Sequence, residues 1–319
     1  MKIVNLDGNA LNPGDLSWEP FQEFGDLTLY ERTQTEAQVI QRIGDAQIIL
    51  LNKVPITDHI MASCPNLKLI CVLATGYNVI DCAAAKQRGI TVCNVPDYGT
   101  ASVAQFTFAL LLELCHRIGH HDQAVHQGKW SECPNFCFWD TPQMELAGKT
   151  FGIIGFGRIG RAVGAIAKAM GMRVIAYNRS RCADGEAIGE YLSLDAVLER
   201  SDILSLHCPL TPATENLINR ETLAKMKEGA ILLNTARGAV LDEEAVKNAL
   251  QSGKLRGAAV DVTRQEPLNS DSPLLAAPNC IITPHMAWTA TEARQRILDC
   301  TMDNIRAYLA GNPINVVNL

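Results

Sequence analysis

The chain has 319 residues, of which 47% are hydrophobic and 19% charged, a balance typical of a globular protein with room for two compact units. The formal charge of −6 and the pI near 5.7 argue against a nucleic-acid partner, because no basic stripe is present to neutralise phosphates. The most hydrophobic run, residues 101–115, is shorter than the ~18 residues of a membrane span, so we expect a buried helix there and no membrane partner.

The eleven cysteines are spread through apolar segments, and residues 1–7 lack the apolar core of a secretory signal, so we expect reduced thiols in a cytoplasmic protein. Only Cys133 and Cys137 lie close together, and C-x-x-x-C without a second ligand pair is not a zinc motif. The chain also contains a local group of histidines, His116, His120, His121 and His126. Because no acidic residue follows at ligand spacing, we expect a solvated helix end and no metal site.

Strand-like runs alternate with helix-like runs along the whole chain, which is the pattern of α/β folds with parallel sheets. A first set of strands is expected at residues 3–6, 27–30, 48–51, 69–73 and 91–94, with helices that include residues 35–44 and 80–88. A long apolar helix at 100–117 and a polar segment at 119–142 follow. The remaining elements are strands at residues 150–154, 173–177, 203–207, 230–234, 258–261 and 280–283, and a last helix at 289–311.

Two sets of strands in series predict two doubly wound, Rossmann-like parallel-sheet domains with a cleft between them. We place a substrate domain at residues 1–99 plus 288–319 and a dinucleotide-binding domain at residues 100–287. In open α/β sheets ligands bind beyond the carboxyl ends of the strands. The polar residues directly after each predicted strand are therefore the candidates for a site.

The most informative motif is the G-x-G-x-x-G loop of Gly155, Gly157 and Gly160, which also contains Arg158 and Ile159. A predicted strand precedes it, and the helix that follows has apolar residues along one face. The first glycine permits a tight turn, the second lets the backbone approach a pyrophosphate, and the third allows the helix to pack on the strand. Together with the N–H groups at the start of the helix, this context predicts a dinucleotide cofactor.

Three further residues follow three successive strands of the second domain. Arg237 lies in the segment Thr235-Ala236-Arg237-Gly238, and Glu266 and His285 follow the next two strands. A guanidinium can grip the carboxylate of a 2-oxo acid with two hydrogen bonds and polarise its carbonyl. The histidine can then supply the proton that the resulting alkoxide needs, and the glutamate can hold its tautomer and favour the imidazolium.

Each of these residues also has a structural interpretation, as a surface charge, a turn residue before Pro267 or a histidine at a helix start. All three at strand ends beside a dinucleotide loop favour hydride exchange with a 2-oxo or 2-hydroxy acid. His207 also ends a predicted strand, but no carboxylate follows a neighbouring strand there, so we interpret it as a hydrogen-bonded scaffold residue.

Over nearly its whole length the chain resembles the D-isomer-specific 2-hydroxyacid dehydrogenases. The matching motifs are residues 74–81, 155–160, 207–211, 234–238, 261–262, 265–267 and 284–285. The resemblance implies catalytic roles for Arg237, Glu266 and His285. It further implies that N–H groups near Thr75 and Gly76 hold the substrate carboxylate. The cofactor contacts that it implies beyond the glycine loop are Cys208, Pro209, Thr235, Ala236 and Asp261, with Asp261 and the Cys208-Pro209 turn at the nicotinamide end.

Within the family, the segment Pro284-His285-Met286-Ala287-Trp288 is most similar to the glycerate dehydrogenase or hydroxypyruvate reductase branch. The sequence ends soon after the last predicted helix, without the regulatory extension common in phosphoglycerate dehydrogenases. Trp288 either lines the substrate pocket or packs in the helix, and both interpretations stay open. Family members usually pair through their cofactor domains, so we expect a homodimer.

The end of the second strand of the cofactor domain bears on the choice of cofactor. NAD-specific members have an acidic residue there for the ribose 2′-OH, whereas this chain has Asn178, followed by Arg179, Ser180 and Arg181. A neutral side chain does not repel a 2′-phosphate, and either arginine can pair with it. The expected cofactor is NAD(P)(H) with a slight preference for NADP, although Asn178 can also bind a 2′-OH.

The function expected from the sequence is therefore hydride transfer between NAD(P)H and a small 2-oxo or 2-hydroxy acid, hydroxypyruvate/D-glycerate or glyoxylate/glycolate. One alternative is a dinucleotide-sensing binding module without turnover, similar to the related corepressors. Another is oxidation of formate or phosphite, which belongs to the same family chemistry.

Overall fold

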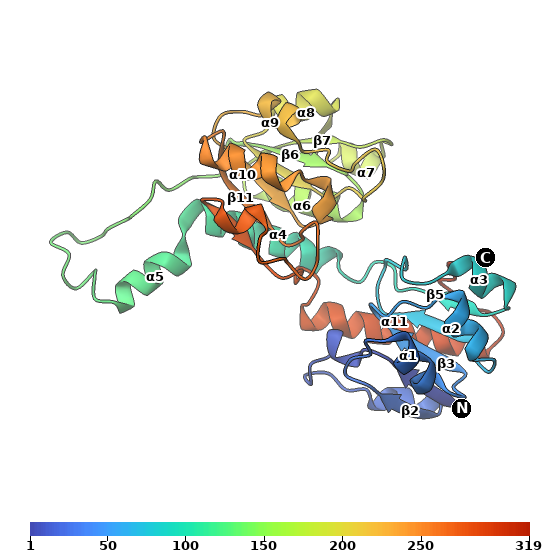
Figure 1. The fold of residues 1–319 in the computed structure, drawn as a ribbon. Helices are drawn as coiled ribbons and strands as arrows, with labels where there is room; N and C mark the ends of the chain where they lie inside the picture. Colours follow the sequence, from blue (N-terminus) through green and yellow to red (C-terminus); the bar gives the residue numbers. More distant parts are fainter. The chain divides into compact units, whose positions relative to one another are not determined.

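The computed structural model describes residues 1–319, which divide into two compact units (Figure 1). Unit 1 comprises Met1–Gly99 and Trp288–Leu319, and unit 2 comprises Thr100–Ala287. Each unit contains one sheet in which every paired strand is parallel, of five strands in unit 1 and seven in unit 2. This confirms the predicted α/β class with two doubly wound sheets. No helix has the length and apolar character that crossing a membrane requires.

The sheet of unit 1 has the strand order β2-β1-β3-β4-β5. Its strands are β1 (Lys2–Asn5), β2 (Asp26–Leu29), β3 (Ile48–Leu51), β4 (Leu69–Val72) and β5 (Thr91–Cys93). Its helices are α1 (Glu36–Ile43), α2 (Asp58–Ser63), α3 (Cys82–Gln87) and α11 (Thr291–Leu309), with 3-10 turns at Gly8–Ala10 and Glu19–Phe24.

Both faces of this sheet are covered, which explains why its central strands are apolar throughout rather than alternating. In β3, Ile49 and Leu51 join a core with α1 and α2, whereas Ile48 and Leu50 join a core on the opposite face with α11. The C-terminal helix therefore belongs to the packing of the N-terminal sheet.

The sheet of unit 2 has the order β12-β11-β10-β9-β6-β7-β8. Its strands are β6 (Thr150–Ile154), β7 (Arg173–Tyr177), β8 (Glu190–Tyr191), β9 (Ile203–Leu206), β10 (Ala230–Asn234), β11 (Leu255–Val260) and β12 (Cys280–Ile282). Its helices are α4 (Thr100–His116), α5 (Ile118–His126), α6 (Arg158–Ala169), α7 (Ala183–Glu186), α8 (Leu194–Arg200), α9 (Arg220–Lys225) and α10 (Glu243–Gln251), with 3-10 turns at Gly238–Val240 and Pro273–Ala276.

The strand order of unit 2 reverses at β6. From β6 the chain adds β7 and β8 on one side of the sheet, and it then returns to add β9, β10, β11 and β12 on the other side. Adjacent connections therefore leave the carboxyl ends of β6 and β9 in opposite directions. Such a topological switch point is where open α/β sheets bind their ligands.

Helices α4 and α6 cover one face of this sheet, and α8, α9 and α10 contribute to the core on the other face. Phe108 of α4 stacks on Phe151 of β6 with ring centroids 5.7 Å apart. In α6, Val163 and Ala167 are fully buried and Ile159 and Ile166 partly buried, so the apolar face predicted for this helix is the one that packs on the sheet.

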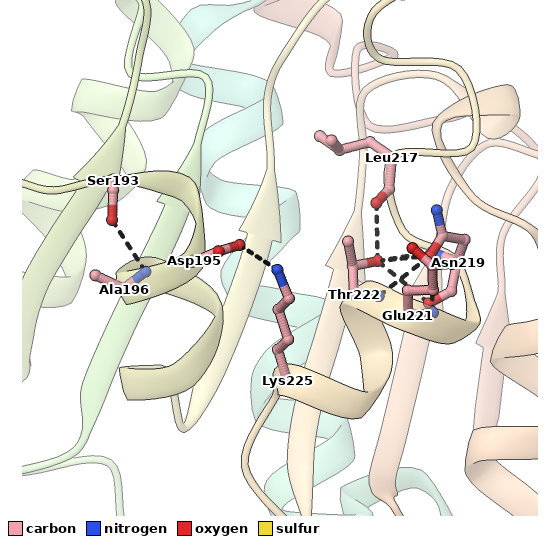
Figure 2. Close-up of polar contacts among 8 residues, drawn as sticks. All are labelled: Ser193, Asp195, Ala196, Leu217, Asn219, Glu221, Thr222 and Lys225. Atoms are coloured by element: carbon pink, nitrogen blue, oxygen red, sulfur yellow. Dashed lines mark hydrogen bonds and ion pairs between the residues drawn. The ribbon is translucent and has the colours of Figure 1, made fainter.

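Two short helices on the second face are fixed by side-chain caps and one ion pair (Figure 2). Ser193 Oγ accepts a hydrogen bond from the backbone N–H of Ala196 at the start of α8. Asn219 caps α9 by accepting from the N–H groups of Glu221 and Thr222. Lys225 and Asp195 join the two helices at 2.7 Å. These contacts satisfy N–H groups that helix starts leave unpaired and hold α8 beside α9.

The structure differs from the predicted elements at several places. Strand β11 begins at Leu255 rather than residue 258, and its register with β10 shifts at Ala230. Helix α5 lies within the segment expected to be simply polar, and Ala124 is its one buried residue. Strand β8 has two residues, too few to produce a pattern in the sequence.

Candidate active site

The glycine loop lies at the switch point, where it contacts the segment that follows β9. Gly155 has φ +93°, and a Cβ at this position would lie 2.4 Å from the backbone nitrogen of Cys208. A Cβ at Gly160 would lie 2.2 Å from the carbonyl oxygen of Gly155. Both positions therefore require glycine, the first for its backbone conformation and both for close packing.

Gly157 differs from its two neighbours, because a Cβ built on it would have no atom of the chain within 4 Å. Gly157 is also the N-cap residue of α6, and no side chain caps this helix. Open space next to the N–H groups at the start of α6, which no side chain caps, is typical of a phosphate-binding site. The loop thus fits a dinucleotide, which Gly155, Gly157, Arg158, Ile159 and Gly160 would hold by its pyrophosphate.

A Gly157→Ala variant is expected to weaken binding of NADH and NADPH alike by at least about tenfold, because the added methyl group would enter the space for the pyrophosphate. The backbone of Gly157, with φ −76°, accepts alanine without strain. The melting temperature without cofactor should therefore stay unchanged. Fluorescence titration with each reduced cofactor measures the effect. Unaltered affinity for both would show that the pyrophosphate does not lie against Gly157.

The ribose end of the predicted cofactor site is formed by the residues after β7. Asn178 Oδ1 accepts from the N–H of Phe156 at 3.2 Å, and Asn178 Nδ2 donates to the carbonyl oxygen of Ser180 at 2.8 Å. The amide thus ties the glycine loop to the next turn. Arg179 and Ser180 are exposed, and Arg179 makes no ion pair within the chain. Arg181 instead lies over the ring of Tyr191.

The segment after β9 contains His207, Cys208 and Pro209. His207 Nε2 lies 2.8 Å from Ser205 Oγ, and burial lowers the pKa of His207 to about 3. It is therefore a neutral, hydrogen-bonded ring at neutral pH, in agreement with the scaffold role expected for it. Burial also raises the pKa of the Cys208 thiol, which keeps it protonated.

Arg237 follows β10 and is exposed. Its Nη1 donates to the neighbouring carbonyl oxygen of Ala236 at 2.7 Å, and no carboxylate pairs with the guanidinium. The turn at residues 235–237 is stabilised by the fully buried side chain of Asn234. Asn234 Oδ1 accepts from the N–H of Ala236, and its Nδ2 donates to the carbonyl oxygen of Arg237, both at 3.0 Å. The fixed turn and unpaired cation suit an anionic ligand.

Glu266 and His285 form a direct pair, with His285 Nδ1 2.7 Å from Glu266 Oε2. Because an ionised carboxylate only accepts hydrogen bonds, the proton of this bond is on Nδ1. Glu266 Oε1 accepts from the N–H of Thr263 at 3.2 Å, which orients the carboxylate. No hydrogen-bond partner within the chain occupies His285 Nε2. The ring therefore presents Nε2 to an incoming group while Glu266 fixes its tautomer.

The loops that carry the three residues follow the neighbouring strands β10, β11 and β12. Two of them touch at Gly238, where a Cβ would lie 1.9 Å from the carbonyl carbon of Thr263. The Glu266–His285 bond joins the second loop to the third. The structure thus brings Arg237, Glu266 and His285 to adjacent strand ends.

Other residues predicted for the cofactor site in unit 2 are less exposed. Thr235 is partly buried, with its hydroxyl 3.2 Å from that of Thr107, and Ala236 is buried. Asp261 is also buried and directs its carboxylate to the turn around His285. The sequence suggested no role for Asn234, although a polar residue at the end of an otherwise apolar strand was a usable signal.

Thr75, Gly76 and Trp288 belong to unit 1. Thr75 is anchored to the segment directly after β5, since its Oγ1 donates to the carbonyl oxygen of Val95 and its own carbonyl oxygen accepts from Asn94 Nδ2. Gly76 is exposed, and its N–H makes no hydrogen bond within the chain. Trp288 packs edge-to-face on Tyr98, with ring centroids 6.2 Å apart.

The histidines at the end of α4 and in α5 contact neighbouring groups instead of converging on one point. His120 Nε2 lies 2.8 Å from Asp140 Oδ2, whereas His116 Nδ1 lies 3.0 Å from Gln143 Oε1. His121 and His126 each face the carbonyl oxygen four residues earlier. No group of three or more His, Cys, Asp or Glu side chains has the arrangement of a metal site.

A glycine loop at the switch point and a histidine–carboxylate pair at strand ends of the same sheet are the features of a nicotinamide-dinucleotide-dependent oxidoreductase. The profile for the NAD binding domain of the D-isomer specific 2-hydroxyacid dehydrogenases matches residues 108–287. The chain belongs to this family. It therefore transfers a hydride between a nicotinamide dinucleotide and a 2-oxo or 2-hydroxy acid, as the sequence predicted.

Full-length relatives support the predicted branch. The chain is 51% identical over 322 residues to a hydroxypyruvate reductase of Blautia hydrogenotrophica, with 100% of both chains covered. It is 41% identical over 318 residues to a glycerate dehydrogenase of Methylorubrum extorquens, which covers 99% of this chain and 98% of the relative. The resemblance to the glycerate dehydrogenase or hydroxypyruvate reductase branch is thus confirmed.

Solved structures are similar over the same length. An acyclic imino acid reductase (Bsp5) in complex with NADPH and D-Arg aligns with a TM-score of 0.84 and 32% identity, covering 99% of this chain and 100% of the other. The TT0316 protein of Thermus thermophilus aligns with a TM-score of 0.85 and 35% identity over the same shares. The likeness therefore extends to both units.

Proposed function

We propose that this enzyme reduces hydroxypyruvate or glyoxylate to the corresponding 2-hydroxy acid, D-glycerate or glycolate. The observation that carries the proposal is the His285–Glu266 pair, which leaves Nε2 available beside the loop of an unpaired Arg237. The names of full-length relatives, hydroxypyruvate reductase and glycerate dehydrogenase, support this substrate class.

In the proposed mechanism the bound nicotinamide dinucleotide supplies the hydride. Arg237 binds the substrate carboxylate and polarises the carbonyl, because its guanidinium has no acidic partner in the chain. His285, protonated at both ring nitrogens, donates the Nε2 proton to the carbonyl oxygen as negative charge develops there. Glu266 stabilises the imidazolium through Nδ1 and returns the ring to the same tautomer after each turnover.

Unit 1 is proposed as the substrate domain and unit 2 as the cofactor domain. Support for the first assignment is the exposed N–H of Gly76, which makes no hydrogen bond within the chain and lies on a loop that Thr75 anchors to the segment after β5. Such an N–H group can donate to the substrate carboxylate. Trp288, held by Tyr98, is proposed to contact the substrate as well.

A steady-state screen tests this proposal. Hydroxypyruvate, glyoxylate, pyruvate and 2-oxoisocaproate are each mixed with NADH or NADPH, and the loss of absorbance is followed. We expect the highest kcat/KM with hydroxypyruvate or glyoxylate. Turnover with none of the acids, despite cofactor binding, would favour a binding module that senses the dinucleotide. If the enzyme turns over none of the oxo acids but reduces the oxidised cofactor with formate or phosphite, oxidation of these donors would be the favoured reaction.

We also propose a preference for NADP over NAD. The support is the neutral Asn178 after β7 together with exposed Arg179 and Ser180, which suit a 2′-phosphate better than an acidic residue would. Asn178 would contact the ribose, and Arg179 would pair with the phosphate.

An Asn178→Asp variant is expected to reverse this preference. A carboxylate at position 178 would repel the 2′-phosphate and accept a hydrogen bond from the 2′-OH, so the ratio of kcat/KM for NADPH to that for NADH should fall by about tenfold or more. Steady-state kinetics with both cofactors gives the ratio. A wild-type enzyme that already strongly prefers NADH would contradict the proposed preference, and Arg179→Gln provides an independent check.

A homodimer formed through unit 2 is proposed on the basis of the segment after α4. Figure 1 shows α5 and the following segment, in green, projecting from the end of α4. Its large side chains Trp130, Phe136 and Trp139 are 51%, 90% and 66% exposed. A second copy of the chain would remove these aromatic groups from water.

A Phe136→Glu variant is expected to shift the protein from dimer to monomer in sedimentation-velocity experiments, because the charge would be buried in the interface. Leu275→Glu is the matched control, since Leu275 is an exposed apolar residue of unit 2 outside this segment. A wild-type protein that sediments as a monomer would refute the dimer.

A cytoplasmic location is proposed from the cysteines, all eleven of which are unpaired. Several are buried, and burial raises the pKa of the Cys93 and Cys280 thiols to about 11. Protonated, buried thiols suit a reducing compartment.

A further inference from the structure

The carboxylate of Asp261, directly after β11, lies beneath the turn that carries His285. Its Oδ1 accepts from the Thr283 hydroxyl at 2.6 Å and from the N–H of Met286 at 2.8 Å. Its Oδ2 accepts from the N–H of Ala287 at 2.8 Å. The Asp261 carboxylate is therefore hydrogen-bonded to residues that precede His285 in the chain and to residues that follow it.

The backbone of Asp261 contributes to the same arrangement. Its carbonyl oxygen accepts from the N–H of His285 at 2.8 Å, and its N–H donates to the carbonyl oxygen of Asn234 at 2.9 Å. The residue is 1% exposed. The backbone of Asp261 is thus hydrogen-bonded both to the end of β10 and to His285.

The turn itself needs such support. His285 has φ +53°, in the left-handed region that side chains with a Cβ disfavour. Relaxation of this residue to an ordinary backbone conformation would redirect the ring and break its contact with Glu266. Hydrogen bonds to an ionised acceptor are stronger than those between neutral groups. Here residues 283, 286 and 287 donate such bonds to the Asp261 carboxylate.

We propose that Asp261 is a positioning residue, whose carboxylate holds residues 283–287 in the conformation that places His285 Nδ1 on Glu266. This inference rests on the proposed role of His285 as proton donor. It differs from the expectation that Asp261 contacts the nicotinamide, because here Asp261 acts through His285.

The Asp261→Asn variant tests this assignment. An amide replaces one carboxylate oxygen by an NH₂ group, which cannot accept from the N–H groups of Met286 or Ala287. We expect kcat to fall by about tenfold or more, with the KM for the reduced cofactor changed by less than about twofold.

A second measurement does not require turnover. The Nδ1–H resonance of His285, assigned by comparison with His285→Asn, is recorded by NMR at one pH. We expect its downfield position in the wild type, which reports the hydrogen bond to Glu266, to be lost in Asp261→Asn. If no 2-oxo acid is turned over by the wild type, the proposed function fails while this resonance still decides the positioning role.

Asp202→Asn is the matched control. The Asp202 carboxylate also accepts from a backbone N–H, that of Thr150 at 2.8 Å, and pairs with Lys227 at 2.9 Å, but it lies at the amino ends of the strands. This variant should lose stability without changing the Nδ1–H resonance of His285. If Asp261→Asn does not fold, Thr283→Val removes one of the three donors and should shift this resonance in the same direction by less.

Two results would overturn the proposal. One is an unchanged Nδ1–H resonance of His285 in a folded Asp261→Asn or Thr283→Val protein. The other is a loss confined to the KM for reduced cofactor, as expected if Asp261 contacts the nicotinamide directly.

Discussion

A His285→Asn variant is expected to lose about 10²–10⁴-fold in kcat, because the amide cannot donate the proton that the developing alkoxide requires. Asparagine is chosen because it tolerates the left-handed backbone of position 285 better than other side chains. Affinity for the reduced cofactor should change little, since the imidazole is not proposed to hold it. Steady-state kinetics and a cofactor titration separate the two effects.

The matched control is His59→Asn. His59 Nδ1 lies 2.8 Å from Glu36 Oε1, so unit 1 contains a second histidine–glutamate pair, which is exposed on the surface. Its replacement should leave kcat within about twofold of the wild type, as for most surface substitutions. Comparable kcat values for the two variants would remove His285 from the proposed mechanism.

An Arg237→Lys variant is expected to lower kcat/KM for the 2-oxo acid by about 10²–10³-fold through both a higher KM and a lower kcat. Lysine keeps the positive charge but cannot supply the planar, two-pronged hydrogen bonding of a guanidinium. The loss of one donor at the carbonyl oxygen accounts for the kcat effect. Initial rates over a range of substrate concentrations give both constants.

Arg200→Lys is the control for this experiment, since Arg200 forms a surface pair with Glu190 at 3.7 Å. It should have wild-type kinetics. Retention of full activity by Arg237→Lys would exclude Arg237 from substrate binding. A change in KM alone would instead restrict its role to holding the carboxylate in the ground state.

The fold class was predictable because the buried strands of parallel sheets are continuous apolar runs separated by helices. The run at residues 150–154 is the strand that the structure shows, and the glycine motif directly after it starts α6. Glycines leave this signal because their spacing reflects local geometry: Gly155 needs a positive φ, and Gly160 must pack against Gly155.

The candidate site was only partly predictable. Arg237, Glu266 and His285 could be selected as polar residues after strands, because the ends of parallel strands meet at one edge of a sheet. The sequence did not indicate that Asn234 and Asp261 hold the turns that carry two of them. The partners of Asn234 are backbone groups two and three residues along the chain, and those of Asp261 follow another strand. Neither set of contacts produces a periodic pattern in the sequence.

By itself, the sequence determined the order of the elements, the glycine loop and the three polar residues at the strand ends, since all of these depend on neighbours close in the chain. Tertiary structure decided the strand order with its reversal at β6, the 2.7 Å contact between Glu266 and His285, and the burial of Asp261 under the histidine turn. These features depend on which distant segments pack together. The packing free energy of a whole core selects that arrangement, and no local pattern encodes it.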